Sequence, residues 1–116
     1  MTEARVDELM ALFSDEAVRT VVRPLVEELA DVEDRIAEIK REPFIRFHPQ
    51  DRSIQRATPA GRLYKDLLAK QTDIARLLLR QLGRSGDDDE DSPLRAYLRT
   101  LERREDGIHG LLAHHP

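Results

Sequence analysis

The stretch VRTVVRPLVEELADVEDRIAEI, residues 18–39, decides how we expect the chain to fold. Its apolar residues recur at alternating steps of four and three over three heptads. This spacing is typical of a helix that packs one face against another helix, as in a coiled coil or a helical hairpin. The positions of this heptad seam are Val18, Val22, Leu25, Leu29, Val32, Ile36 and Ile39.

Prolines mark where the neighbouring elements begin and end. Pro24 falls inside the seam, and it predicts either a kink or a helix that starts near Val22. Pro43 predicts the end of the seam helix, because a residue before proline avoids the α region. Residues 43–49 alternate between apolar and polar and predict an extended edge strand or a loop, and the polar residues 50–57 predict a loop.

Three further helices follow from capping residues and apolar spacing. Thr58-Pro59 and Ser92-Pro93 each place a capping residue before a proline that suits the first helical turn. The first pair predicts a helix that stops at Gly83, and the second predicts a helix from Pro93 to about residue 106 that Gly107 ends. A short helix over residues 2–13 precedes the seam, with a cap at residues 14–16 and one apolar side made of Val6, Leu9, Met10 and Phe13.

These elements predict an all-α fold. We expect a long antiparallel helical hairpin with short N-terminal and C-terminal helices, assembling into a homo-oligomer. Residues 1–86 form the oligomerisation and DNA-contact domain with a proline-bounded loop at 43–58, residues 87–92 an acidic linker, and residues 93–116 a C-terminal helix and flexible tail. Self-association is expected because a chain of 116 residues, 36% of them charged, has a thin core. The core and oligomer contacts are assigned to the heptad seam and to Leu63, Leu67, Ile74 and Leu78.

Charge is distributed unevenly along the chain, although the net charge is only −4. Residues 1–39 carry −7, residues 40–86 carry +7 and residues 87–116 carry −4. The basic middle predicts a surface for a polyanion, and the alternative is that acidic and basic segments pair within the fold or between subunits. The candidate DNA-binding residues are Lys40, Arg41, Arg46, Arg52, Arg56, Arg62 and Lys65.

Several classes of chemistry lack their sequence signatures. The chain has no cysteine, no phosphate-binding loop and no nucleophile elbow, so we predict no cofactor, no metal site and no catalytic residue. His114 and His115 are interpreted as part of a tail, His48 as structural, and residues 87–91 as a solvated linker or, alternatively, a nucleic-acid mimic. No apolar run approaches the roughly 20 residues of a membrane helix and the N-terminus lacks a signal core, which predicts no membrane partner and a cytosolic protein.

Segments between residues 20 and 100 resemble the small terminase subunits of tailed phages. They are LVEEL (25–29), continuing through Ile36 and Ile39 into PFIRFHP (43–49), then TPA (58–60) with LYKDLL (63–68), and SPLR (92–95). The resemblance implies a non-enzymatic, ring-forming subunit that binds the packaging site on double-stranded viral DNA. It also implies that this subunit delivers the DNA to the large terminase, an ATPase and nuclease, and regulates it in the cytoplasm of the infected bacterial host.

One feature of the family is missing from the sequence. Many small terminases carry an N-terminal helix-turn-helix, but the acidic N-terminal segment here has no recognition helix. We therefore expect the basic residues of the middle segment to contact DNA. The alternative function is a helical oligomeric scaffold or protein-interaction module with no nucleic-acid role.

Overall fold

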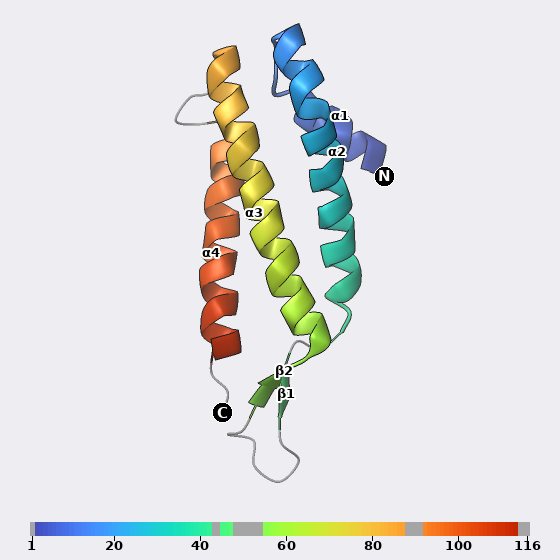
Figure 1. Cartoon of the computed structure of the whole chain (residues 1–116), viewed down its shortest axis with the longest axis vertical. Coiled ribbons are helices and arrows are strands. Elements are labelled where there is room, and N and C mark those ends of the chain that lie inside the picture. Colours follow the sequence, from blue (N-terminus) through green and yellow to red (C-terminus); the bar gives the residue numbers. More distant parts are fainter. Residues whose placement is uncertain (1, 43–44, 48–54, 88–91, 114–116) are drawn as a thin grey trace.

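The computed structural model describes residues 2–42, 45–47, 55–87 and 92–113, and the described chain forms four α-helices and one pair of short strands (Figure 1). In chain order the elements are α1 (Thr2–Met10), α2 (Glu16–Ile39), β1 (Ile45–Phe47), β2 (Gln55–Ala57), α3 (Pro59–Ser85) and α4 (Pro93–Ala113). The all-α character expected from the sequence is confirmed, with the two strands as a small addition.

Helix α1 ends at Met10, earlier than the predicted residue 13, and residues 11–15 connect it to α2. The side chain of Arg19 donates hydrogen bonds from Nη1 to the carbonyl oxygens of Met10 at 2.5 Å and Phe13 at 2.8 Å. It thereby satisfies carbonyls at the end of α1 that have no partner within the helix. Asp15 caps α2 by accepting a hydrogen bond from the backbone N–H of Val18 at 3.1 Å, which confirms the predicted start of the seam helix.

Helix α2 runs through Pro24 as a single element. Pro24 lies on the exposed side, and no new helix starts at Val22. The seam faces the core: Val22 and Leu29 have no exposed surface, and their seam neighbours are buried or packed against buried residues. Val26 and Ala30, outside the seam, are also buried. They lie at helical spacing from Glu33, which pairs with α1, so this second apolar row of α2 is covered by α1.

Helix α3 begins as the sequence predicts and ends later. The Thr58 hydroxyl accepts a hydrogen bond from the backbone N–H of Gly61 at 3.0 Å. The expectation that Gly83 stops the helix is wrong, because α3 continues to Ser85 and Gly86 caps it in the left-handed conformation, with φ of 79°. The N–H groups of Gly86 and Asp87 donate to the carbonyls of Gly83 and Leu82 respectively, as in a Schellman motif. Among the described residues, Gly86 alone adopts the positive φ that makes glycine favourable at a helix end.

The connection between α2 and α3 contains paired strands. Strand β1 agrees with the extended segment expected at 43–49, whereas the prediction of a loop across residues 50–57 is wrong at residues 55–57, which form β2. The strands pair antiparallel with Arg46 opposite Arg56. Strand β1 alternates between apolar and polar residues, whereas β2 (Gln-Arg-Ala) does not, so the local pattern could not predict β2.

Helix α4 begins at the predicted Ser92-Pro93 pair, where the Ser92 hydroxyl accepts from the N–H of Leu94 at 3.2 Å. The expectation that Gly107 ends the helix and that a loose tail starts at residue 108 is wrong, because α4 continues to Ala113. Helix α4 contains two internal glycines, Gly107 and Gly110. Each costs a helix only about 1 kcal/mol, so neither is enough to end it. The buried residues Leu94, Leu98 and Leu101 place α4 against the core.

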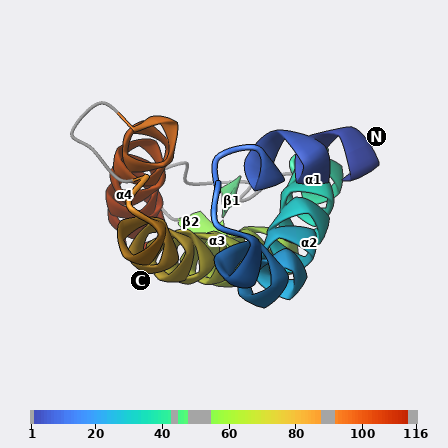
Figure 2. The same cartoon turned by 90° about the horizontal axis from the view of Figure 1, so that it is seen from above.

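The helices lie side by side in an arc. Figure 1 shows α2 and α3 running in opposite directions along the long axis, and Figure 2 shows the order α4, α3, α2, α1 around the arc. Helices α1 and α4 cover the inner side of the α2–α3 layer, where the buried apolar residues of all four helices form one core. The outer faces of α2 and α3 are left uncovered by the other described helices.

Candidate nucleic-acid interface

The antiparallel course of α2 and α3 brings predicted basic residues together at one end of the molecule. Helix α2 ends next to Lys40 and Arg41, and the first two turns of α3 carry Arg62 and Lys65. The two strands lie between them in the chain, at the same end of the helices (Figure 1). We call this set, with Arg46 of β1 and Arg56 of β2, the basic end.

Lys40 is held at the C-terminus of α2 by two interactions. It caps the helix, and its backbone N–H donates to the carbonyl of Ile36 at 3.0 Å. Its ammonium nitrogen lies 5.7 Å from the centre of the Tyr64 ring, a cation–π contact between the end of α2 and the start of α3. The carbonyl groups at a helix C-terminus favour a cation. These contacts give one charge of the basic end a defined position.

The structure describes the remaining candidate DNA-binding residues to different extents. Arg41 and Arg62 are exposed and Lys65 is partly buried. The paired register places Arg46 and Arg56 directly opposite one another in the strands. Arg52 lies outside the described residues. Among described residues the acids of this region are Glu38, Glu42 and Asp66, all exposed, so cations outnumber carboxylates at this end.

A second basic row extends along the exposed side of α3, and the candidate set did not include it. Arg80 and Arg84 are exposed four residues apart, and neither side chain makes a hydrogen bond or ion pair with another described residue. Arg76, one turn before Arg80, is instead paired with Asp73 at 3.4 Å and with Glu102 of α4 at 3.3 Å. The spacing of four is visible in the sequence, but separating free from paired arginines requires the position of α4.

The residues assigned to the core and oligomer contacts lie mostly inside the chain. Of the α3 set, Leu67, Ile74 and Leu78 are buried, whereas Leu63 retains 36% of its surface. In the seam, Val18, Leu25 and Ile39 are partly buried against the core and the others are buried. Packing of α2 on α3 and α1 therefore uses these side chains within one copy of the chain.

Four acidic residues of the N-terminal segment, two from α1 and two from α2, lie close together. A shallow groove between α1 and α2, of about 350 Å³, is lined by four carboxylates and one arginine: Glu3, Asp7, Glu27, Asp31 and Arg23 among others. The division of charge along the sequence is thus also a division in space, with an acidic α1–α2 flank and a more basic α3 side.

One polar cluster joins all four helices. Arg5 of α1 donates two hydrogen bonds to the Glu33 carboxylate of α2, from Nε at 2.9 Å and from Nη2 at 3.0 Å. The Tyr97 hydroxyl of α4 donates to Glu33 Oε2, and the side-chain amide of Gln71 of α3 donates to the Tyr97 hydroxyl at 2.7 Å. The Arg5 guanidinium also lies 5.4 Å from the centre of the Tyr97 ring. We call these four residues the four-helix cluster.

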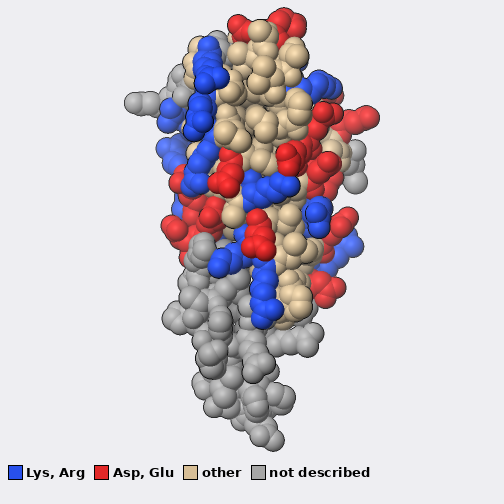
Figure 3. All heavy atoms as spheres, in the orientation of Figure 1, with Lys and Arg blue, Asp and Glu red and all other residues tan. Residues whose placement is uncertain are grey.

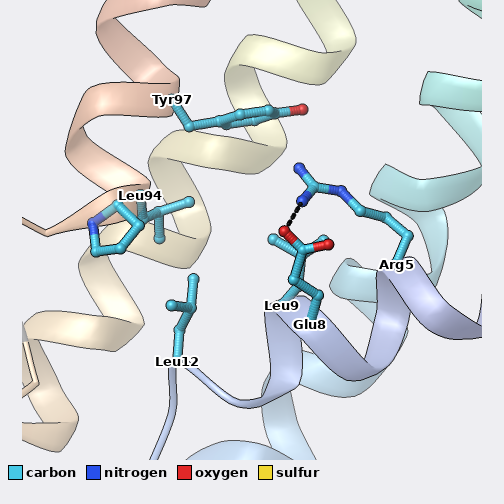
Figure 4. Close-up of a pocket in the computed structure, with 7 residues that line it drawn as sticks. Arg5, Glu8, Leu9, Leu12, Leu94 and Tyr97 are labelled. Carbon is cyan, nitrogen blue, oxygen red and sulfur yellow. Dashed lines mark hydrogen bonds and ion pairs between the residues drawn. The ribbon is translucent and has the colours of Figure 1, made fainter.

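A pocket of about 180 Å³ opens beside this cluster, between α1 and α4 (Figure 4). Arg5, Tyr97 and Glu8 form its polar side, and Leu9, Leu12 and Leu94 form its apolar side. Arg5 is already paired with Glu33 and, at 3.0 Å, with Glu8. The cluster and its pocket are therefore best interpreted as the junction that fixes α1 and α4 on the α2–α3 layer.

The cluster predicts an alkaline loss of stability that depends on Tyr97. Burial raises the pKa of its phenol above the usual value of about 10, the hydrogen bond to Glu33 raises it further, and the bond from Gln71 opposes them. Above about pH 10 the unfolded chain loses this proton while the folded chain keeps it, so the free energy of unfolding falls as pH rises. Urea unfolding measured from about pH 8 to about pH 11.5 should show this fall in the native protein.

The matched variant is Tyr97→Phe, which has no phenol to titrate. We expect a lower stability than the native protein at neutral pH and a shallower decline above about pH 10. Equal slopes for the two proteins would contradict the assignment of a raised pKa to Tyr97.

Two other kinds of site are absent from the described part of the chain. No group of three or more histidine and acidic side chains within it is arranged to hold a metal ion. None of its helices combines the length and apolar character needed to cross a membrane. The interpretations given to His48, His114 and His115 fall outside the described residues.

The chain was also compared with known proteins. No family model matches it, and comparisons with curated proteins and with solved structures found no match.

Proposed function

We propose that this protein is a non-enzymatic DNA-packaging subunit of the small-terminase type. In this proposal an oligomer binds packaging-site DNA, delivers it to the large terminase and regulates that enzyme in the cytoplasm of the infected host. The observation that carries the proposal is the basic end, where residues from α2, the strands and α3 meet. The resemblance of residues 20–100 to small terminases supplies the biological setting.

The basic end suits the phosphate backbone of DNA rather than base edges. Arg41, two residues after the end of α2, and Arg62, in the first turn of α3, are both exposed. The described elements between them are a pair of strands and not the turn of a helix-turn-helix. Arginine and lysine side chains on several elements can contact successive phosphates of one duplex. Binding of this kind depends strongly on salt and weakly on sequence.

The test is DNA affinity as a function of salt for the native chain and for Arg41→Glu/Arg62→Glu. We expect native binding to weaken steeply with added salt, and we expect the variant to bind at least about tenfold more weakly with a shallower salt slope. Fluorescence anisotropy of a labelled duplex of about 30 base pairs measures both quantities.

The matched control is Arg23→Glu/Arg99→Glu, which makes the same change of charge at exposed residues of α2 and α4 outside the basic end. It should bind DNA within about threefold of the native chain, because its changed charges act only at long range and are screened by salt. Equal losses in both variants would show that net charge, not the basic end, governs binding. No native binding at low salt would refute the DNA role.

A second candidate function is a helical scaffold or interaction module without nucleic acid. The acidic α1–α2 flank and the exposed apolar residues of α2 and α3 favour it, because neither feature serves phosphate binding. The DNA experiment separates the two functions, since a scaffold keeps its self-association and binds no duplex.

A further inference from the structure

The outer face of the α2–α3 layer carries exposed apolar side chains that the chain itself does not cover. Val21 of α2 keeps 59% of its surface and Leu77 of α3 keeps 40%. Ala17, Thr20 and Pro24, all exposed and uncharged, lie within one turn of Val21 on the same helix. Figure 3 shows this uncharged area as a tan band over the upper parts of α2 and α3, with Lys and Arg along its left edge.

An ion pair fixes which residues of the two antiparallel helices lie at the same level. Lys70 Nζ of α3 lies 2.7 Å from Glu28 Oε1 of α2. Val21 is seven residues before Glu28, and Leu77 is seven residues after Lys70. Seven residues are two helical turns, about 10.5 Å, in the same direction along the molecule, so Val21 and Leu77 are level with each other. We call this pair and its uncharged neighbours on α2 the outer patch.

Charges of opposite sign border the outer patch on its two helices. Arg80 and Arg84 follow Leu77 on α3, and Asp15 and Glu16 precede Val21 on α2. By the same counting, Arg84 is level with the start of α2, within about 3 Å along the axis of Glu16. The face therefore has an acidic site on α2, a basic site on α3 at the same height, and apolar residues between and below them.

We propose that this face pairs with the same face of a second copy of the chain. This inference rests on the self-association included in the proposed function. A two-fold axis parallel to the helices lays α2 of each copy over α3 of the other, antiparallel. Val21 then lies opposite Leu77 of the partner copy. The start of α2 lies opposite the partner's Arg80–Arg84 segment. The two Glu28–Lys70 pairs lie against each other with opposite charges facing.

This two-fold contact has a consequence for larger assemblies. In an isologous contact both copies use the same face, so the assembly through this face ends at a dimer. A ring then requires a different surface for its subunit contacts, and its building unit is the pair. Rotation about an axis perpendicular to the helices would instead place α2 on α2, with acidic segments facing one another.

A second copy explains this face better than DNA does. Phosphates would be attracted to Arg80 and Arg84 but would meet Val21 and Leu77, which offer no hydrogen bond, and then Glu16, which repels them. A copy of the chain satisfies both charged sites and covers the apolar residues. The charge and apolar patterns thus point to one partner.

The test is the mass of the purified full chain in the absence of DNA, measured by sedimentation across a range of concentrations. The native chain should reach at least twice the monomer mass of 13.4 kDa. Val21→Glu/Leu77→Glu should weaken the pairing at least about tenfold, because it places carboxylates against carboxylates in the contact. Ala4→Glu/Ala96→Glu adds the same charge at exposed sites on α1 and α4 and should leave the mass unchanged.

A charge exchange tests the orientation. Arg84→Glu should weaken the pairing, and adding Glu16→Arg in the same chain should restore it, because each contact regains an opposite pair. At a protein concentration low enough to keep every protein monomeric, the thermal unfolding of each variant, followed by circular dichroism, should stay close to that of the native chain, since all of these side chains are exposed.

The outcomes separate this inference from the DNA role. A native chain that stays monomeric, or a Val21→Glu/Leu77→Glu variant that assembles like the native chain, overturns the proposed face. Failure of the charge exchange to restore pairing overturns the two-fold arrangement. DNA affinity measured on the same proteins decides the DNA role independently, because the outer patch does not include the residues of the basic end.

Discussion

Replacing Val22 with aspartate is expected to unfold the protein. Val22 has no exposed surface and belongs to the heptad seam that packs within the chain. A carboxylate placed there without a partner costs several kcal/mol, which is about the whole free energy of unfolding of a small domain. The loss of helical circular dichroism at 25 °C in the variant is the measurement.

The neighbouring residue provides a control of the same type on the same helix. Val21 keeps 59% of its surface, so Val21→Asp should change the free energy of unfolding by no more than about 0.5 kcal/mol. The comparison is made at low protein concentration, where self-association adds nothing to stability. If the two variants unfold at the same urea concentration, the burial of the seam is wrong.

Glu33→Ala is expected to give the second largest loss, about 2–3 kcal/mol in the free energy of unfolding. The Glu33 carboxylate accepts both hydrogen bonds of the Arg5 fork and that of the Tyr97 hydroxyl, and the side chains of Arg5 and Glu33 are only 27% and 22% exposed. Its removal leaves the Nε and Nη2 groups of Arg5 and the Tyr97 hydroxyl without their acceptor, at the place where α1 and α4 are attached. Urea unfolding at neutral pH measures the loss.

Glu8 supplies the matched control, because it pairs with the same arginine at 3.0 Å but is 70% exposed. Glu8→Ala should cost less than about 0.5 kcal/mol, as expected for a pair in contact with solvent. A loss for Glu8→Ala equal to that for Glu33→Ala would show that net charge, and not the four-helix cluster, determines the effect. Hydrogen exchange that becomes faster in α1 of the Glu33 variant would locate the damage at this junction.

Local sequence signals predicted the starts of helices better than their ends. Asp15, Thr58 and Ser92 cap the helices that follow them, because a side-chain oxygen needs only the N–H groups of the next turn. The ends at Gly83 and Gly107 were predicted wrongly. Glycine permits a helix to end but does not require it, and packing of α3 and α4 along the core carries both helices further.

Periodicity predicted one of the two apolar rows of α2. The seam follows steps of four and three, and these residues do face the core. Val26 and Ala30 complete a second row only because α1 folds back over α2, which no spacing within α2 reveals. Strand β2 was missed for a related reason, since three residues of a short strand are defined by their pairing with β1.

The candidate interface was predicted as a set of residues but not as a surface. Charge counting marks residues 40–86 as basic, and the structure brings Lys40 and Arg41 to the same end as Arg62 and Lys65. It also shows that Arg76 is occupied by Asp73 and Glu102, while Arg80 and Arg84 have no partner among the described residues. The spacing of residues along the sequence does not show which arginines pair with residues of another helix.

The sequence by itself determined the helical composition, the helix starts, the buried seam of α2 and the separation of acidic from basic segments. These properties depend on residues within a few turns of one another, where backbone geometry fixes which side chains share a face. Only the tertiary structure decided that Arg5, Glu33, Gln71 and Tyr97 form one cluster. It also decided that Val21 and Leu77 remain exposed outside the core. Those relations depend on how the helices are placed against each other, and that placement results from the packing of the whole core.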